Sequence, residues 1–214
     1  PEPGTANKAE AWARGRVMGG SSAINGLMYV RGQPADYDGI AELSSEDWSW
    51  QHIGPAYAAL ENHHLGQGDC RGDQGPLRLS LPGKDVRARI HEAILAAGKA
   101  MGLPVKEDVN TPDNGEAIGY ASRNVWKGRR QSAAVAFLNP VRHRKNLTIL
   151  TNAITDKLLL DGKKVVGVEI VQKGQVRRIM AHETILCGGA MATPGILERS
   201  GVGDPAVLQP LGFE

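Results

Sequence analysis

The sequence predicts an α/β protein, and three patterns support this fold class. A glycine-rich turn at residues 15–26 opens into apolar residues that suit a helix. The last third of the chain holds short β-prone runs separated by turn residues. An apolar run at 184–187 then leads through glycines into a helical segment, the strand–turn–helix order of an open α/β sheet. We therefore expect mostly helices first, and an antiparallel β-meander with one parallel strand at the end.

Composition limits the class of protein and its partners. The chain of 214 residues is 41% hydrophobic and 22% charged, which excludes a disordered chain and allows one large or two small domains. The net charge is +2, and the basic clusters at 129–130, 142–145 and 177–178 lack interleaved aromatic residues. We interpret these clusters as solvated surface and expect no nucleic-acid partner.

Two further features, the length of the apolar runs and the cysteine content, predict where the protein is located. No apolar run is long enough to span a bilayer, so we expect no integral membrane segment; peripheral membrane association of a longer protein stays open. Cys70 and Cys187 make no disulfide framework, which favours a cytoplasmic location. The chain starts at Pro1 without a methionine and ends at Glu214 in what looks like the middle of an element. We expect it to be a piece of something longer.

The turn at 15–26 is suited to an anion. Glycines without side chains let a phosphate approach main-chain N–H groups, and the positive end of a helix dipole adds to the attraction. Ser21 or Ser22 is expected to cap the helix that the turn opens. An ordinary loop with a helix cap is the alternative interpretation.

The elements in the middle of the chain are predicted from the spacing of apolar residues and from the positions of glycine and proline. After Gly32 and Pro34 we expect a loop, because both residues end helical geometry. The pair His63-His64 ends the next helix, and neighbouring helical residues diverge, so no metal site is expected. The glycines of 66–75 miss the dinucleotide fingerprint by one residue and predict a surface loop. The expected elements are a helix at 53–62, a strand at 77–81, a helix at 86–101 and a polar loop at 108–115.

Residues 118–126 alternate in character, which predicts a strand with a mixed polar and aromatic face. This face suits either the lining of a substrate cavity or a buried polar strand, and both interpretations stay open. Ser132 is expected to cap a short helix at 133–138, which Asn139-Pro140 ends.

The last third contains five β-prone runs. Asp161-Gly162 and Lys173-Gly174 predict hairpins between three of them. The last run, 184–187, is nearly all apolar, as in a buried parallel strand, and Gly188 to Ala190 lead from it into a helix at 194–199. Open α/β sheets bind ligands at the carboxyl ends of such strands. The runs lie at 147–151, 157–160, 165–171, 176–180 and 184–187.

The glycine-rich turn at 15–26 and the glycine-containing segment that begins at 189 resemble the two signatures of the glucose-methanol-choline (GMC) flavoprotein oxidoreductases. Residues 15–26, GRVMGGSSAING, resemble the first signature, and residues 189–203, GAMATPGILERSGVG, resemble the second. The likeness is strongest to choline dehydrogenase-like alcohol dehydrogenases. Matching segments between the signatures lie at 29–32, 47–50, 75–77, 128–130 and 146–149.

The resemblance implies an FAD-binding Rossmann-like domain, incomplete in this chain, that is interrupted by an inserted α+β substrate domain. Residues 1–32 and 146–204 would be two parts of the FAD domain. Residues 33–145 would form the substrate-binding domain, and residues 205–214 would start the next segment.

The resemblance also implies which residues hold FAD. Some relatives tether FAD through a histidine where this chain has Ile24, so FAD is expected to be non-covalent. The implied contacts are Gly19, Gly20, Ser21 and Ser22 along the pyrophosphate and flavin, Asn25 and Gly26 at the flavin ring, the main chain of Ala153 and Ile154 at the adenine, and Gly189 and Ala190 near the ribityl and pyrophosphate groups.

The family's chemistry is oxidation of an alcohol to an aldehyde or ketone, with hydride passed to flavin N5. The family's amino-terminal Gly-x-Gly-x-x-Gly unit is absent from this sequence, and so is its carboxyl-terminal catalytic histidine with a His or Asn partner. We therefore assign no catalytic residue and no metal to this chain, and we expect these 214 residues alone to bind no FAD tightly and to be inactive. The electron acceptor stays unknown. A hydroxynitrile lyase on the same scaffold, a non-catalytic remnant and a generic nucleotide-binding α/β protein are the alternatives.

Overall fold

The computed structural model describes residues 9, 11–83 and 87–213, which cluster into two compact units, Pro1–Leu147 and Thr148–Glu214. Each unit is described by itself. The division falls two residues from the expected domain boundary at 145/146, and residues 11–32 cluster with the segment that follows them. The assignment of 1–32 and 146–204 to a single FAD domain stays a prediction.

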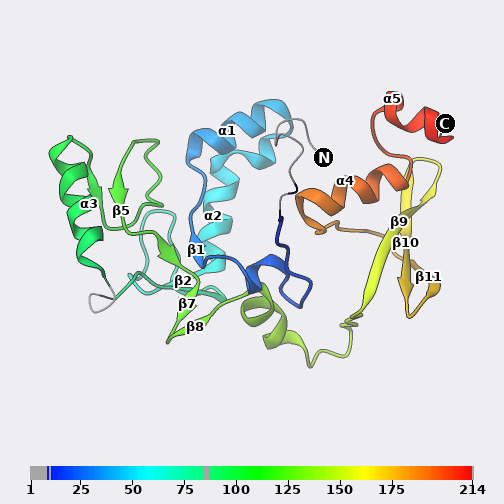
Figure 1. The fold of residues 1–214 in the computed structure, drawn as a ribbon, viewed down its shortest axis with the longest axis horizontal. Coiled ribbons are helices and arrows are strands. Elements are labelled where there is room, and N and C mark those ends of the chain that lie inside the picture. Colours follow the sequence, from blue (N-terminus) through cyan, green and yellow to red (C-terminus); the bar gives the residue numbers. More distant parts are fainter. Residues whose placement is uncertain (1–8, 10, 84–86, 214) are drawn as a thin grey trace. The chain divides into compact units, whose positions relative to one another are not determined.

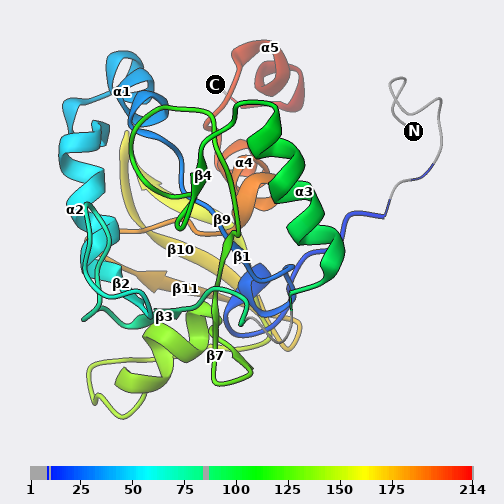
Figure 2. The same cartoon turned by 90° about the vertical axis from the view of Figure 1, so that its left-hand side faces the viewer.

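Helices α1 and α2 of the first unit lie side by side (Figures 1 and 2), and a hydrogen bond of 2.5 Å joins the hydroxyls of Tyr37 and Tyr57. The prediction of a loop after Gly32 was wrong, because Pro34 begins α1 where no N–H is needed. Gln33 and Asp36 form a capping box there. The predicted helices α2 and α3 are confirmed; Val86, where the latter was expected to begin, lies outside the described residues. The expected end of α2 at His63-His64 was wrong, because α2 ends at Leu60 and Glu61–His63 form a strand. The bounds are α1 Pro34–Leu43, α2 Trp50–Leu60, α3 Arg89–Ala100, and the short turns η2 Gly20–Ala23, η3 Glu46–Trp48, η5 Ala134–Leu138 (a π-helical turn) and η6 Asn139–Val141.

The strands of the first unit form small two-stranded sheets, antiparallel for β1–β6 and β7–β8 and parallel for β2–β3 and β4–β5. The single strand expected at 118–126 is broken into β5, β6 and β7, because each piece pairs with a different partner. Ser122 and Asn124 are buried and Arg123 is exposed, as the alternation predicted. The bounds are β1 Met28–Tyr29, β2 Glu61–His63, β3 Leu77–Leu79, β4 Val105–Lys106, β5 Ile118–Gly119, β6 Ser122–Arg123, β7 Val125–Trp126 and β8 Arg129–Arg130.

The second unit is a three-stranded antiparallel sheet in the order β11-β10-β9, with α4 against β9 (Figure 1). Two-residue loops join the strands. Lys173 and Gly174 have φ of 53° and 77°, as a type I′ turn requires. The other loop is Gly162-Lys163, one residue later than expected, and only Gly162 has positive φ. The bounds are β9 Ala153–Asp161, β10 Lys164–Gln172, β11 Gln175–Met180, α4 Gly189–Arg199, α5 Pro205–Leu208 and η7 Gln209–Leu211, and the core is Leu158, Ile170, Ile196 and Leu208.

Two of the five expected strands do not form. Residues 147–151 and 184–187 pair with no strand in the part of the chain that the structure describes, and Ile185 is 79% exposed. The predictions of a strand at 147–151 and of a buried parallel strand at 184–187 were therefore wrong, because a β-prone run becomes a strand only beside a hydrogen-bonding partner. Helix α4 begins at Gly189 and contains Pro194.

Among the described residues, no helix combines the length and the apolar character that crossing a bilayer requires.

Candidate functional site

The turn at residues 15–26 is shaped by two glycines in the left-handed region. Gly19 has φ of 94° and Gly20 has φ of 55°. The helix expected here does not form: a single 3₁₀ turn, η2, is followed by β1 at Met28. The residue at the N-cap of η2 is Gly19, so the prediction that Ser21 or Ser22 caps a helix was wrong.

The two serine hydroxyls hold the turn together instead. Ser21 Oγ accepts a hydrogen bond of 3.2 Å from the Gly15 N–H. Ser22 Oγ donates to the Gly19 carbonyl at 2.5 Å and accepts from the Ala133 N–H at 2.8 Å. Both hydroxyls are therefore engaged within the protein, and the backbone is what the turn presents to a ligand.

The glycines of the turn face different surroundings. A Cβ on Gly19 would lie 3.2 Å from the Cβ of Ala134, so this glycine permits close packing on η5. A Cβ on Gly20 or on Gly26 would meet nothing within 4 Å. The turn thus packs on one side and leaves bare backbone beside open space on the other, which fits the close approach of a phosphate.

Arg130, on β8, holds the far end of the turn. Its Nη1 donates to the Ser22 carbonyl at 3.2 Å, to the Asn25 carbonyl at 2.8 Å and to Asn25 Oδ1 at 2.6 Å. The interpretation of Arg129-Arg130 as solvated surface was wrong for Arg130, because this residue is half-buried. The one sequence feature that distinguished Arg130 was its place in segment 128–130, which matches the family.

A buried ion pair fixes the chain just after β1. Arg31 lies 3.3 Å from Glu61, and both side chains are almost fully buried. Tyr29 donates to Glu61 Oε1 at 2.6 Å, while Arg31 donates to the carbonyls of Cys70 and Asn110. Burial raises the pKa of Glu61, although its hydrogen bond from Tyr29 and the Arg31 charge act in the opposite direction. No local sequence pattern indicated this network, because its members lie far apart in the chain.

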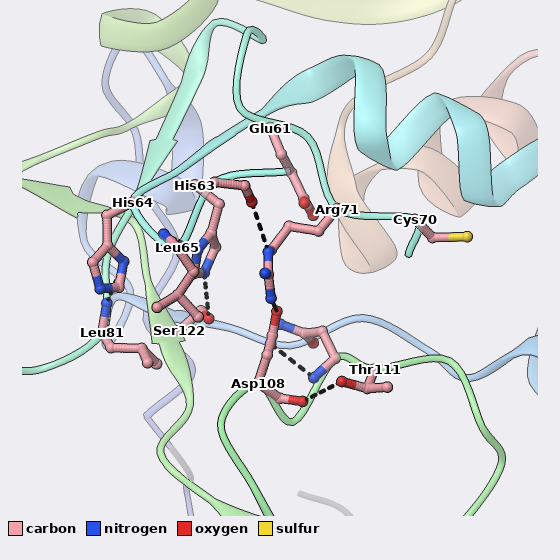
Figure 3. A network of polar contacts seen from close by, with 12 residues as sticks. Glu61, His63, His64, Leu65, Cys70, Arg71, Leu81, Asp108, Thr111 and Ser122 are labelled. Atoms are coloured by element: carbon pink, nitrogen blue, oxygen red, sulfur yellow. Dashed lines mark hydrogen bonds and ion pairs between the residues drawn. The ribbon is translucent and has the colours of Figure 1, made fainter. Parts of the chain in front are cut away.

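His63 belongs to a neighbouring polar network (Figure 3). Its Nε2 lies 2.9 Å from Oγ of the fully buried Ser122, and its Nδ1 accepts from the Leu65 N–H. The proton therefore sits on Nε2 in the neutral ring. Burial lowers the pKa of His63 to about 4, so the ring is neutral at pH 7 and serves the fold. In the same view Arg71 pairs with Asp108 at 3.1 Å.

The two interpretations of residues 118–126 apply to different parts of the segment. Ile118 and Tyr120 help to line a hollow of about 250 Å³ together with Met28 and Ile94, whereas Ser122 is buried in the polar network. In the described part of the chain, no cluster of three or more His, Cys, Asp or Glu side chains could hold a metal ion.

The remaining predicted cofactor residues lie in the second unit. Gly188 is the N-cap of α4, and Gly189 has φ of 84°, where an added Cβ would meet nothing within 4 Å. Ala190 follows in the first turn of α4, and Ala153 and Ile154 begin β9. The structure therefore gathers the six predicted residues of the first unit into one turn and places the other four on two elements of the second. That both sets contact one cofactor stays a prediction.

A mixed helix-and-sheet chain with a bare glycine turn is compatible with a nucleotide-dependent protein, and comparison with known proteins narrows the class. Residues 3–212 match the family model described as GMC oxidoreductase. The chain belongs to the GMC oxidoreductase family.

Individual relatives agree with this assignment. The chain is 41% identical, over its whole length, to an oxygen-dependent choline dehydrogenase of Chromohalobacter salexigens, and it spans 38% of that protein. It resembles the crystal structure of pyridoxine 4-oxidase from Mesorbium loti with a TM-score of 0.86 and 40% identity, covering 96% of this chain and 40% of that one. It also resembles an FAD-dependent oxidoreductase from Chaetomium thermophilum, with a TM-score of 0.81, 28% identity, and 94% and 37% coverage. The chain thus spans well under half the length of these relatives.

Proposed function

We propose that this chain is part of an FAD-dependent oxidoreductase that converts a small alcohol, of the choline type, to an aldehyde or ketone. Bound FAD would supply the hydride acceptor, its N5 atom. The observation that carries the proposal is the turn at Gly19 and Gly20, in which Gly20 leaves bare backbone beside open space in a chain of the GMC family. The name of the Chromohalobacter relative makes molecular oxygen the candidate electron acceptor.

The residues of the turn would hold FAD through their backbone. The N–H groups of Gly19, Ser21 and Ser22 would bind the pyrophosphate, while the Gly20 N–H donates to the Val17 carbonyl at 2.8 Å. Gly20 would contribute its missing side chain, which permits the shortest approach. Asn25 and Gly26 would lie at the flavin ring. Gly189 and Ala190 would approach the ribityl and pyrophosphate groups, and the main chain of Ala153 and Ile154 would meet the adenine.

FAD would be bound without a covalent bond through position 24. Ile24 has a hydrocarbon side chain, which offers no nucleophile to the flavin. Acid precipitation of the flavin-loaded protein should therefore release all the flavin into the supernatant. Flavin retained in the pellet would contradict this part of the proposal.

The chain would contribute binding, and the group that takes the alcohol proton would lie in residues beyond it. His63 is engaged on both nitrogens and buried, so it is not available to a substrate. The cytoplasmic location expected from the cysteines remains a prediction.

The decisive experiment uses the protein as its gene encodes it, purified without added flavin. We expect FAD to co-purify, choline or pyridoxine to bleach the flavin absorbance under anaerobic conditions, and oxygen to restore it. Release of cyanide from a cyanohydrin with no bleaching by any alcohol would favour the lyase. A colourless protein that takes up no FAD would favour the non-catalytic remnant and overturn the proposal. The 214-residue chain alone should stay colourless.

A further inference from the structure

We infer that Arg130 is a positioning residue for flavin chemistry, because it orients the Asn25 amide so that its –NH₂ group faces the ligand. This inference rests on the proposed function and adds to it a residue 105 positions away from Asn25. It starts from the hydrogen bonds around a single atom, Asn25 Oδ1.

Two donors converge on Asn25 Oδ1. Arg130 Nη1 lies 2.6 Å away, and the Leu27 N–H lies 3.2 Å away. Neither group can accept a hydrogen bond, so only the oxygen of the amide fits between them and the flipped orientation is excluded. Among the described residues no group accepts a hydrogen bond from Nδ2, and the Asn25 side chain is exposed. The amide therefore presents donors to whatever covers this face.

The oxidised flavin ring carries acceptor atoms along its edge, and reduction adds negative charge to the ring. A donor beside such an edge stabilises the reduced form more than the oxidised form and raises the reduction potential. The guanidinium of Arg130 adds a fixed positive charge behind the amide. Arg130 also holds the Ser22 and Asn25 carbonyls, so it links the pyrophosphate end of the turn to its flavin end.

The sharpest test is Asn25→Asp in the protein as its gene encodes it. The aspartate keeps an oxygen for Arg130 and for the Leu27 N–H, so a purely structural role for Asn25 predicts an unchanged flavin. The inference predicts a lower flavin reduction potential, because a donor is lost and a negative charge is placed at the ring. The potential is measured by titration with a reference dye.

Arg130→Met and Arg130→Lys test the second residue. We expect Arg130→Met to lower the potential and to raise the FAD dissociation constant about tenfold, and Arg130→Lys to restore part of both. Arg129→Met is the matched control, since Arg129 is exposed on the same strand and its side chain makes no hydrogen bond to the turn among the described residues. It should leave both quantities unchanged.

The outcomes separate the two proposals. A wild-type protein that binds no FAD overturns the proposed function and this inference with it. A wild-type protein that binds FAD, with unchanged potentials in Asn25→Asp and Arg130→Met, overturns the inference alone. A lowered potential in both variants, with Arg129→Met unchanged, supports it.

Discussion

At the scale of single residues, Gly19 and Gly20 are neighbours with separate roles. Both have left-handed backbone, but only Gly19 is covered, by Ala134 and Ser132. The folded structure requires glycine at position 19 for two reasons, its positive φ and its close packing. Gly20 is constrained by φ alone, which leaves its open side for a ligand.

Alanine at these two positions should therefore separate stability from binding. We expect Gly19→Ala to lower the free energy of unfolding by about 2 kcal/mol, because left-handed strain and contact with Ala134 add. Gly20→Ala should cost about 1 kcal/mol but weaken FAD binding at least tenfold, because its methyl group enters the open space. Urea unfolding and FAD titration measure the two quantities. Equal FAD affinities in the two variants would contradict this division of roles.

His63 makes stability depend on pH in a defined direction. Its folded pKa, about 4, lies below the ordinary value of 6.5, so between these limits the unfolded chain binds a proton that the folded chain does not. The free energy of unfolding should fall as pH decreases through this window, by up to about 3 kcal/mol from this residue. The variant His63→Gln should lose that dependence, while exposed His143→Gln should retain it. Equal pH slopes for all three proteins would refute the assignment.

At the scale of elements, the Arg31–Glu61 pair joins the end of β1 to the start of β2. Removing one charge of a buried pair leaves the other uncompensated. Glu61→Gln should lower the free energy of unfolding by about 3–5 kcal/mol, measured in urea. Glu42→Gln is the control, because Glu42 is exposed on α1, and it should change the free energy of unfolding by less than about 0.5 kcal/mol. A small effect at position 61 would show that water reaches the pair.

The hairpin between β10 and β11 offers a gain in stability. Lys173 has φ of 53°, which asparagine tolerates better than lysine in a type I′ turn. Lys173→Asn should raise the free energy of unfolding by about 0.5 kcal/mol. Lys163→Asn, in the other hairpin loop, should give no gain because φ is not positive there. Equal gains at the two positions would mean that left-handed strain is not the cause.

Elements with local signals were predictable, and elements that depend on distant partners were not. α2 and α3 followed from apolar spacing, and the hairpins from Gly162 and Gly174. α1 was not predicted, because proline ends a helix when it lies in the interior. Here Pro34 is the first residue of α1, and the capping box between Gln33 and Asp36 starts the helix around it. Residues 184–187 have strand-like composition, but strand formation needs a neighbour that composition does not supply.

At the scale of the whole molecule, a ligand that binds only the folded state stabilises all of it. FAD at a hundredfold excess over its dissociation constant should add about 2.7 kcal/mol to the free energy of unfolding of the protein as its gene encodes it. The midpoint of thermal unfolding should rise with FAD concentration, and it should rise less for Gly20→Ala. A midpoint that does not respond to FAD would contradict the proposed site.

The sequence predicted part of the candidate site. The glycines of the turn were visible because bare backbone leaves a local signature. The resemblance to the family added four residues of the second unit, and that these contact the same cofactor stays a prediction. The role of Arg130 was not visible, because a side chain's partner depends on how distant segments fold together. Ser22 illustrates the same limit, since its hydroxyl bonds to Ala133 rather than capping a helix.

The contact between Arg130 and Asn25 also sets an order of events during biosynthesis. The two residues are 105 positions apart, so at typical elongation rates Arg130 is added roughly 5 to 20 s after Asn25. Until then the nascent chain lacks the guanidinium that fastens the loop, and the Ala133 N–H comes later still. On the proposed function, cofactor loading would therefore be a late step, and a ribosome-bound polypeptide that stops before position 130 should carry no flavin.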